Sequence, residues 1–316
     1  MNIFITGSAG FIGSHLSERL LADGHCVTAI DNFDPFYERD VKEANLEGCF
    51  THKRFAFHEA DIRDQSAIEE LLGNQAIDLI VHLAARAGVR PSIVDPAGTY
   101  GANVNGTLHL LEAARKLSIM KFVFASSSSV YGNNEKVPFS EIHSVDDPIS
   151  PYAASKKSGE LLCYTYHHLY DMDVSCLRFF TVYGPRQRPD LAIHKFARLI
   201  MQNRPIPVYG DGSMQRDFTY IDDIIQGVVA AVDCCTGYEI YNLGESQPVR
   251  LDTLIKEIEK AMGQKAIIER LPNQPGDVYQ TYADIGKARD KLGYRPHTNI
   301  QKGLEEFVRW LNDSNG

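Results

Sequence analysis

The amino-acid sequence predicts an α/β protein with a doubly wound parallel sheet and a smaller C-terminal domain. Over residues 1–180, short apolar segments alternate with longer helical segments, a pattern typical of a parallel sheet that is covered by helices on both faces. A glycine-rich turn stands between the first strand and the first helix. Beyond residue 181 the alternation loosens, which indicates a second structural unit.

The expected elements follow one another with short connections. Strands are expected at Asn2–Thr6 and at residues 26–30, 54–59, 79–83, 121–125, 174–179, 238–242 and 266–269. Helices are expected at residues 14–23, 65–72, 101–117, 152–170, 191–203, 251–262, 284–292 and 300–312, and another begins at 220–223. We therefore expect one domain of residues 1–181 plus 217–242 and a second of residues 182–216 plus 243–316.

Composition excludes several classes of protein. The 316 residues carry a formal net charge of −9 with no basic block, which argues against a nucleic-acid partner. Six cysteines without CxxC spacing indicate neither a disulfide framework nor a metal site. No apolar run approaches the ~20 residues of a membrane span, and the chain begins directly with a strand, so no membrane association is expected. We expect a cytoplasmic protein.

The turn after the first strand has glycine at positions 7, 10 and 13. Such glycines permit a tight turn and let a pyrophosphate approach the backbone N–H groups at a helix N-terminus. The second strand ends in Asp31, whose carboxylate is suited to accept hydrogen bonds from an adenosine ribose and to repel a 2′-phosphate. The next cation along the chain is Arg39, so the sequence favours NAD over NADP. Plain turn glycines remain the alternative.

Other candidate residues follow the later strands, where ligands of a doubly wound sheet bind. Asp61 and Ile62 are placed to flank an adenine, although Asp61 could equally cap the next helix. In the second half, Arg186, Arg188 and Arg216 present the forked donors that suit a diphosphate. Solvated surface arginines are the alternative for each of them.

Tyr152 and Lys156 stand four residues apart at the start of an expected helix, so their side chains point the same way. An ammonium beside a phenol stabilises the phenolate and lowers its pKa, which would let the pair exchange a proton with a substrate hydroxyl. The spacing alone is common by chance, and its meaning depends on the surrounding motifs.

Four motifs together resemble the extended short-chain dehydrogenase/reductase family over essentially the whole chain. They are Gly7-x-x-Gly10-x-x-Gly13, His82-Leu-Ala-Ala85, Ser126-Ser-Ser-Ser-Val-Tyr-Gly132 and Tyr152-x-x-x-Lys156. More narrowly, residues 31–37, 178–190, 215–220 and 293–310 resemble the UDP-glucuronate 4-epimerases. The resemblance implies a Rossmann domain that binds NAD and a smaller domain that binds a UDP-sugar.

The resemblance also implies a reaction and roles for named residues. NAD would oxidise C4 of the sugar, the 4-keto intermediate would turn over in the pocket, and reduction from the other face would convert UDP-glucuronate to UDP-galacturonate. Tyr152 would exchange the 4-hydroxyl proton, Lys156 would lower the pKa of Tyr152, and Ser127 would hydrogen-bond the same oxygen. The residues implied to border the cofactor are Gly7, Gly10, Phe11, Ile12, Gly13, Asp31, Asn32, Asp61, Ile62, Leu83, Ala84, Ala85, Tyr152, Lys156 and Phe180. Those implied to bind substrate are Arg90, Ser127, Ser128, Thr181, Arg188, Arg216, Asp277 and Tyr279.

Departures from sibling families distinguish between reactions. Nucleotide-sugar dehydratases and decarboxylases carry an acidic residue where this chain has Ser128 and Ser129, and elimination needs such a second acid or base. UDP-galactose 4-epimerases usually carry Asn in place of Thr181. The alternatives are a UDP-glucose or UDP-N-acetylhexosamine 4-epimerase, then a decarboxylase, and, from another class, a non-catalytic NAD-binding regulator. The resemblance also implies a homodimer through the helices at 101–117 and 152–170.

Overall fold

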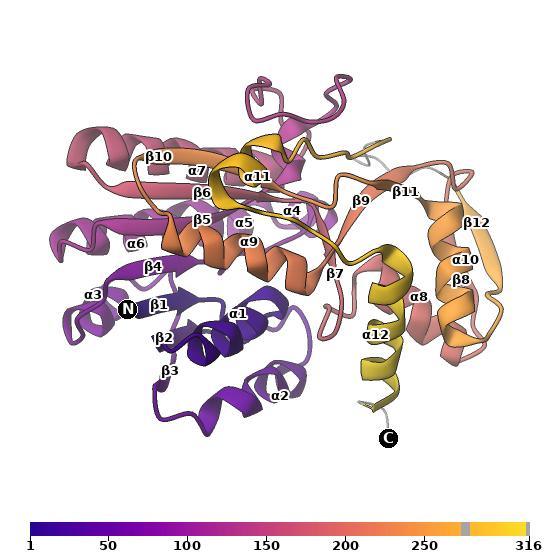
Figure 1. The fold of residues 1–316 in the computed structure, drawn as a ribbon, viewed down its shortest axis with the longest axis horizontal. Helices are drawn as coiled ribbons and strands as arrows, with labels where there is room; N and C mark the ends of the chain where they lie inside the picture. Colours follow the sequence, from indigo (N-terminus) through magenta and orange to yellow (C-terminus); the bar gives the residue numbers. More distant parts are fainter. Residues whose placement is uncertain (273–278, 314–316) are drawn as a thin grey trace.

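The computed structural model describes residues 1–272 and 279–313, and its larger part is a seven-stranded parallel sheet (Figure 1). The strand order is β10-β6-β5-β4-β1-β2-β3. The strands are β1 (Asn2–Thr6), β2 (Cys26–Asp31), β3 (Phe55–Glu59), β4 (Leu79–His82), β5 (Lys121–Ser127), β6 (Asp173–Phe179) and β10 (Tyr238–Leu243). All the pairings within this sheet are parallel, so the expected doubly wound sheet is confirmed.

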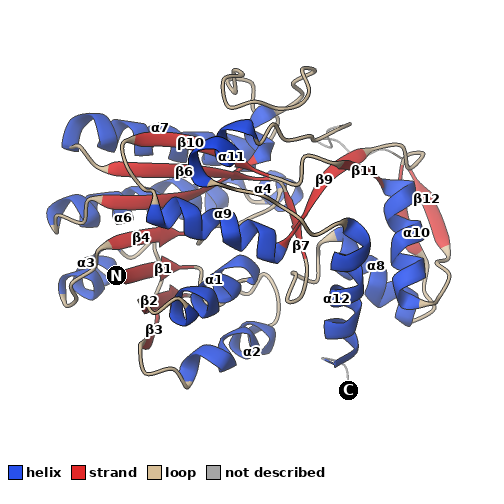
Figure 2. Ribbon diagram, in the orientation of Figure 1, coloured by secondary structure: helices blue, strands red, loops and turns tan. Residues whose placement is uncertain are grey.

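Apolar residues alternate between the two faces of the sheet, and each face buries its own set of helices (Figure 2). Ile3 and Ile5 of β1 belong to the core that contains α1 (Phe11–Ala22) and α9 (Ile221–Asp233). Phe4, between them, points to the opposite core, which is shared with α3 (Gln65–Gly73), α6 (Gly106–Lys116) and α7 (Pro151–Tyr170). This period of two explains why the central strands β1 and β4 carry apolar residues on both faces.

The strand order reverses next to β1. The chain proceeds outward from β1 through β2 to β3, and β4 then returns to the other side of β1. In open α/β sheets this reversal leaves a crevice beyond the carboxyl ends of the strands, which is where ligands bind.

A smaller part follows β6 and is built from two short sheets and three helices, seen at the right of Figure 1. One sheet has the order β11-β9-β7 and the other the order β12-β8. The strands are β7 (Thr181–Tyr183), β8 (Ile206–Tyr209), β9 (Gln215–Tyr220), β11 (Pro248–Arg250) and β12 (Ile268–Leu271). The helices are α8 (Ala192–Met201), α10 (Leu251–Met262) and α12 (Ile300–Asp313), while α11 (Gly286–Leu292) lies against β10.

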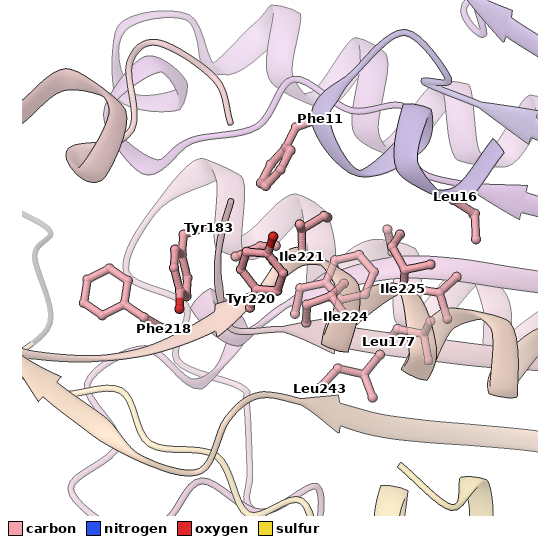
Figure 3. Packing of buried hydrophobic residues seen from close by; sticks show 14 of the residues in the cluster. Phe11, Leu16, Leu177, Tyr183, Phe218, Tyr220, Ile221, Ile224, Ile225 and Leu243 are labelled. Carbon is pink, nitrogen blue, oxygen red and sulfur yellow. The ribbon is translucent and has the colours of Figure 1, made fainter. Parts of the chain in front are cut away.

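The hydrophobic core is continuous between the two parts. Tyr183 and Phe218 of the smaller part belong to the same buried cluster as Ile224 of α9 and Leu177 of β6 (Figure 3). The division into the two residue sets expected from the sequence stays a prediction.

Several elements differ from the expected ones. Two helices that were not expected are α2 (Arg39–Phe50) and α4 (Val89–Val94). The helix expected at 101–117 consists of a π-helical turn at Gly101–Asn105 and α6, and it is preceded by α5 (Pro96–Tyr100). The wide turn contains Asn103, whose amide bonds both to the backbone of Arg86 and to Ser155 of α7, contacts that helical periodicity does not reveal. Within residues 1–272 and 279–313, no helix is long and apolar enough to cross a bilayer.

Candidate active site

A cavity of about 550 Å³ lies at the carboxyl ends of the central strands. Most of the candidate residues line it. They are Gly7, Gly10, Phe11, Ile12, Gly13, Asp31, Asn32, Asp61, Ile62, Leu83, Ala84, Ala85, Ser127, Ser128, Tyr152, Lys156, Phe180, Thr181, Arg188 and Arg216. The structure thus brings residues from most of the chain into one continuous space.

The glycine turn at one end of the cavity is packed too tightly to hold side chains. A Cβ on Gly13 would lie 2.1 Å from the carbonyl oxygen of Gly7, and one on Gly7 would lie 2.7 Å from the amide nitrogen of Ala84. Gly7 also has a positive φ of 73°. Gly10 begins α1, and within the described chain no side chain caps that helix terminus. The exposed N–H groups and the close backbone fit the diphosphate of a dinucleotide.

Asp31 closes this end of the cavity. Its carboxylate accepts hydrogen bonds from the amides of Ala9 at 3.1 Å and Phe33 at 2.9 Å, which fix it between β2 and the glycine turn. Burial raises the pKa of Asp31, and the two amide bonds oppose that rise. An acceptor held in this way fits the hydroxyls of an adenosine ribose.

Asp61 and Asn32 are joined at the neighbouring strand ends. Asn32 donates to the Asp61 carboxylate at 2.8 Å, and Arg63 binds the same carboxylate through two nitrogens. The bonds from Arg63 lower the pKa of Asp61 to about 2. Asp61 therefore does not cap the next helix, whose N-terminal amide is held by Asp64 instead.

The cation beside Asp31 is Lys42 and not Arg39. The Arg39 guanidinium is bound by Glu43 and Glu59. Lys42 is 5% exposed, donates to the carbonyl of Asp34 at 2.5 Å and lines the cavity. Lys42 was not predicted as a cavity residue, because it faces inward from α2 and this helix was itself not expected.

At the centre of the cavity, the N-terminus of α7 holds Tyr152. Ser150 caps this helix by accepting from the amide of Ala153 at 3.1 Å, and Pro151 takes the first helical position. The amide of Tyr152 donates to the hydroxyl of Ser92 in α4 at 3.0 Å. These contacts set the start of the helix and therefore the direction in which Tyr152 points.

The pKa of Tyr152 differs from the expectation. Burial raises it, while a hydrogen bond with Ser127 and the charge of Arg188 lower it, and burial has the larger effect. Lys156 donates from Nζ to the carbonyl of Ala125 at 2.6 Å, and burial lowers its own pKa to about 8. Ser127 and Arg188 thus favour the phenolate, while the effect of Lys156 on the pKa of Tyr152 stays a prediction.

Ser127 stands at the end of β5 and begins a short helical turn, η2 (Ser128–Tyr131). Its Oγ accepts from the amide of Ser129 at 3.2 Å and from the Ser129 hydroxyl at 3.0 Å. Ser128 and Thr181 line the same cavity. Ser127, which hydrogen-bonds Tyr152, thus shares the cavity with two further hydroxyl groups.

The expected arginine clamp is only partly assembled. Arg188 lines the cavity, where it binds Asp190 through two nitrogens and donates to the carbonyl of Ala87 at 3.3 Å. Arg216 lines it too, with Nη1 bonded to the carbonyl of Gln215 at 2.8 Å. Arg186 does not belong to the described cavity lining and instead binds Glu18 of α1 at 2.7 Å.

Two further candidates lie apart from the cavity lining. Arg90 is exposed, and its guanidinium lies over the ring of Tyr209 at 4.8 Å. Tyr279 is 63% exposed and meets β9 through its carbonyl, which accepts from the amide of Gln215. Neither belongs to the described cavity lining. Asp277 lies outside the described residues.

Arg86 is a cavity residue that the sequence reading missed. It follows β4 and forms ion pairs with Asp95 and, at 3.8 Å, with Asp34 after β2. These strands flank β1, so the guanidinium bridges the crevice beside the glycine turn. Its position next to the His82-Leu-Ala-Ala85 motif was the signal that could have found it.

Comparison with known proteins places the chain in a family. The model of the GDP-mannose 4,6 dehydratase family matches residues 4–307. The chain belongs to this family. It is thereby a member of the extended short-chain dehydrogenase/reductases, as its motifs indicated.

Within the family, the chain is similar to several nucleotide-sugar epimerases. It is 42% identical to the UDP-glucuronate 4-epimerase of Thermodesulfobacterium geofontis, over 98% of this chain and 96% of that protein. The crystal structure of the UDP-glucuronic acid 4-epimerase of Bacillus cereus with UDP-glucuronic acid and NAD matches with a TM-score of 0.94, 38% identity and coverage of 99% and 100%. The UDP-glucose 4-epimerase of Thermotoga maritima with UDP-glucose matches with a TM-score of 0.93, 31% identity and full coverage of both chains.

Proposed function

We propose that this protein is a UDP-glucuronate 4-epimerase that uses bound NAD to invert C4 of the sugar. One observation carries the choice of reaction. Among the described residues that line the cavity, the carboxylates are Asp31, which ends β2, and Asp34 and Asp61, which follow β2 and β3. The lining also offers the hydroxyls of Ser127, Ser128 and Thr181, and Ser127 hydrogen-bonds Tyr152. Elimination needs a second acid or base near the sugar, whereas epimerisation does not.

The residues present fit NAD. The Gly7–Gly13 turn would hold its diphosphate, Asp31 its adenosine ribose, and Lys156 and the Leu83–Ala85 backbone the nicotinamide end. The relative from Bacillus cereus was crystallised with NAD, which supports this assignment. When bound, NAD supplies the reversible oxidation of C4.

The protein's own groups would move the proton. The Tyr152 oxygen takes the proton of the 4-hydroxyl group and gives it back after the sugar has turned over. Ser127, which hydrogen-bonds Tyr152, is placed to hold the same sugar oxygen. Arg188 and Arg216 would meet the diphosphate of the UDP-sugar, which competes with Asp190 for the Arg188 guanidinium.

The hydroxyls would also protect the substrate from losing CO₂. Oxidation of C4 creates a β-keto acid, which decarboxylates readily when its C5–C6 bond lies parallel to the carbonyl π system. Ser127, Ser128 and Thr181 can hold the carboxylate out of that alignment through charge-assisted hydrogen bonds.

The test is to supply the purified protein with UDP-glucuronate, UDP-glucose and UDP-N-acetylglucosamine in parallel and to resolve the products by NMR. We expect UDP-galacturonate with little UDP-pentose. Activity confined to UDP-glucose would favour the neutral-sugar epimerase, and UDP-pentose as the main product would favour a decarboxylase. Turnover of none of the three with NAD present would favour a non-catalytic NAD-binding protein.

We also propose that the protein is a homodimer through α6 and α7. Leu161 and Tyr164 of α7 are 55% and 52% exposed, and Leu108 of α6 is 36% exposed. Exposed apolar side chains on adjacent helices are typical of an interface.

We propose further that the protein is located in the cytoplasm. The six cysteines are all free, which supports a reducing compartment.

A further inference from the structure

A buried ion pair joins β6 to α7, the helix that carries Tyr152. Arg178 of β6 donates from Nε and Nη2 to the two carboxylate oxygens of Glu160 in α7, both at 2.8 Å. Both residues are 1% exposed. Removing two charges from water costs free energy that their attraction often does not recover, so a pair of this kind is weak evidence for stability alone.

Residues 126–131, the serine segment, are hydrogen-bonded to this ion pair at both ends. At its start, the hydroxyl of Ser126 donates to Glu160 Oε1 at 2.6 Å. At its end, Arg178 Nη1 donates to the hydroxyl of Tyr131, the last residue of η2, at 2.9 Å. Ser127 and Ser128 lie between these two attachments, which restrain the backbone that carries their hydroxyls.

Glu160 of the ion pair also helps to set the register of α7 against β5, together with Lys156. Lys156 and Glu160 are one helical turn apart and bond to consecutive residues of β5, Ala125 and Ser126. Tyr152 is one turn before Lys156 on the same helix. The two bonds therefore fix Tyr152 relative to the end of β5, where Ser127 begins the serine segment.

The network extends to the last strand of the large sheet. Tyr131 donates to Oδ1 of Asn242 in β10 at 2.8 Å, and Asn242 Nδ2 donates to the carbonyls of Phe139 and Asp284. The serine segment is thus held through Tyr131 by elements distant in the sequence.

We propose that the Glu160–Arg178 pair is a positioning device that sets how much of the oxidised sugar is epimerised and how much loses CO₂. The inference rests on the proposed function. In the side reaction the C5–C6 bond breaks, its electron pair enters the C4 carbonyl as an enolate, CO₂ leaves, and C5 takes a proton from solvent. The hydride that was removed from C4 must then return to that carbon to give the UDP-pentose. Hydroxyls held at both ends of their segment restrain the carboxylate, whereas loosened ones let it rotate into the reactive alignment.

Two variants test the proposal at different strengths. Ser126→Ala removes one hydrogen bond to Glu160 and leaves the ion pair intact. The double variant Glu160→Gln with Arg178→Met removes both charges together, which avoids an uncompensated buried charge. The matched control is Glu306→Gln with Arg309→Met, which removes an exposed pair on α12.

The decisive measurement is the ratio of UDP-pentose to UDP-galacturonate formed from UDP-glucuronate. We expect Ser126→Ala to raise it, and the double variant to raise it further while kcat falls by about 10- to 100-fold and KM changes little. The pH profile of kcat should move to higher pH, because a weaker Ser127 hydrogen bond lowers the pKa of Tyr152 less. The control should match the wild type in product ratio, kcat, KM and pH profile.

A purely structural role gives a different result. A Ser126→Ala protein with a lower melting temperature but the wild-type product ratio and pH profile would overturn the inference. If the double variant does not fold, the result for Ser126→Ala alone decides whether the inference holds. Failure of the wild type to produce UDP-galacturonate would instead overturn the proposed function, and with it this inference.

Discussion

Tyr152 is held between opposing effects on its pKa. Burial favours the neutral phenol, while Ser127 and Arg188 favour the phenolate. Arg188 is itself held by Asp190, so a diphosphate that binds this guanidinium would change the charge around the phenol. We therefore expect substrate binding and proton transfer to be coupled through this arginine.

At this scale, Tyr152→Phe should lower the rate of epimerisation by about 10²- to 10⁴-fold, because it removes the hydroxyl that exchanges the proton. Circular dichroism and UDP binding, measured by calorimetry, should stay close to the wild type. Tyr164→Phe, the same change at a half-exposed position of the same helix, is the control and should remain active. A Tyr152→Phe protein with most of its activity would remove this residue from the mechanism.

Individual residues were predictable where backbone chemistry dictates them. Gly7 and Gly13 followed from the need for close backbone contact, and both line the cavity. Lys42 and Arg186 were not predictable in this way. A long side chain takes its direction from the element that carries it, and its partner from tertiary structure, and neither is visible in local sequence.

Among the elements, α7 connects the sequence to the site most directly. Its start is encoded locally, by Ser150 as the cap and Pro151 at the first helical position. Its inner face then bonds to β5 through Lys156 and Glu160. A change in where this helix begins would move Tyr152.

Ser150→Ala should therefore lower the free energy of unfolding by about 1 kcal/mol and the melting temperature by roughly 2 °C. Turnover should fall as well, because the first turn carries Tyr152. Ser158→Ala on the same helix is the control, since the Ser158 hydroxyl only bonds back to the carbonyl of Ala154 and leaves no amide uncapped. Equal melting temperatures for the two variants would show that the cap does not stabilise the helix.

Strands of the large sheet were predictable to within one or two residues, because most of them are buried on both faces and are rich in apolar residues. The π-helical turn at Gly101–Asn105 was not, since the cause of its wide turn is a side chain that bonds across to another helix. The short strands β7, β8, β9 and β11 pair with partners from distant parts of the chain, so their local patterns are weak.

For the whole molecule, the proposed homodimer makes a prediction about solution size. Light scattering of the wild type should give twice the mass of the chain, because α6 and α7 expose apolar side chains on one side. Leu161→Glu combined with Tyr164→Glu should yield a monomer. Ile267→Glu, an equally exposed apolar residue before β12, should leave the dimer intact. A monomeric wild type would refute the interface.

Strand β10 joins the large sheet only after the chain has built part of the smaller one, since residues 180–237 separate it from its partner β6. On a ribosome, the nascent chain therefore presents β6 as an unpaired edge until residue 243 has emerged. At typical rates of synthesis this interval lasts roughly 3 to 13 s. An open, apolar edge strand invites pairing with other chains, so the newborn protein passes through a period in which it is prone to aggregate.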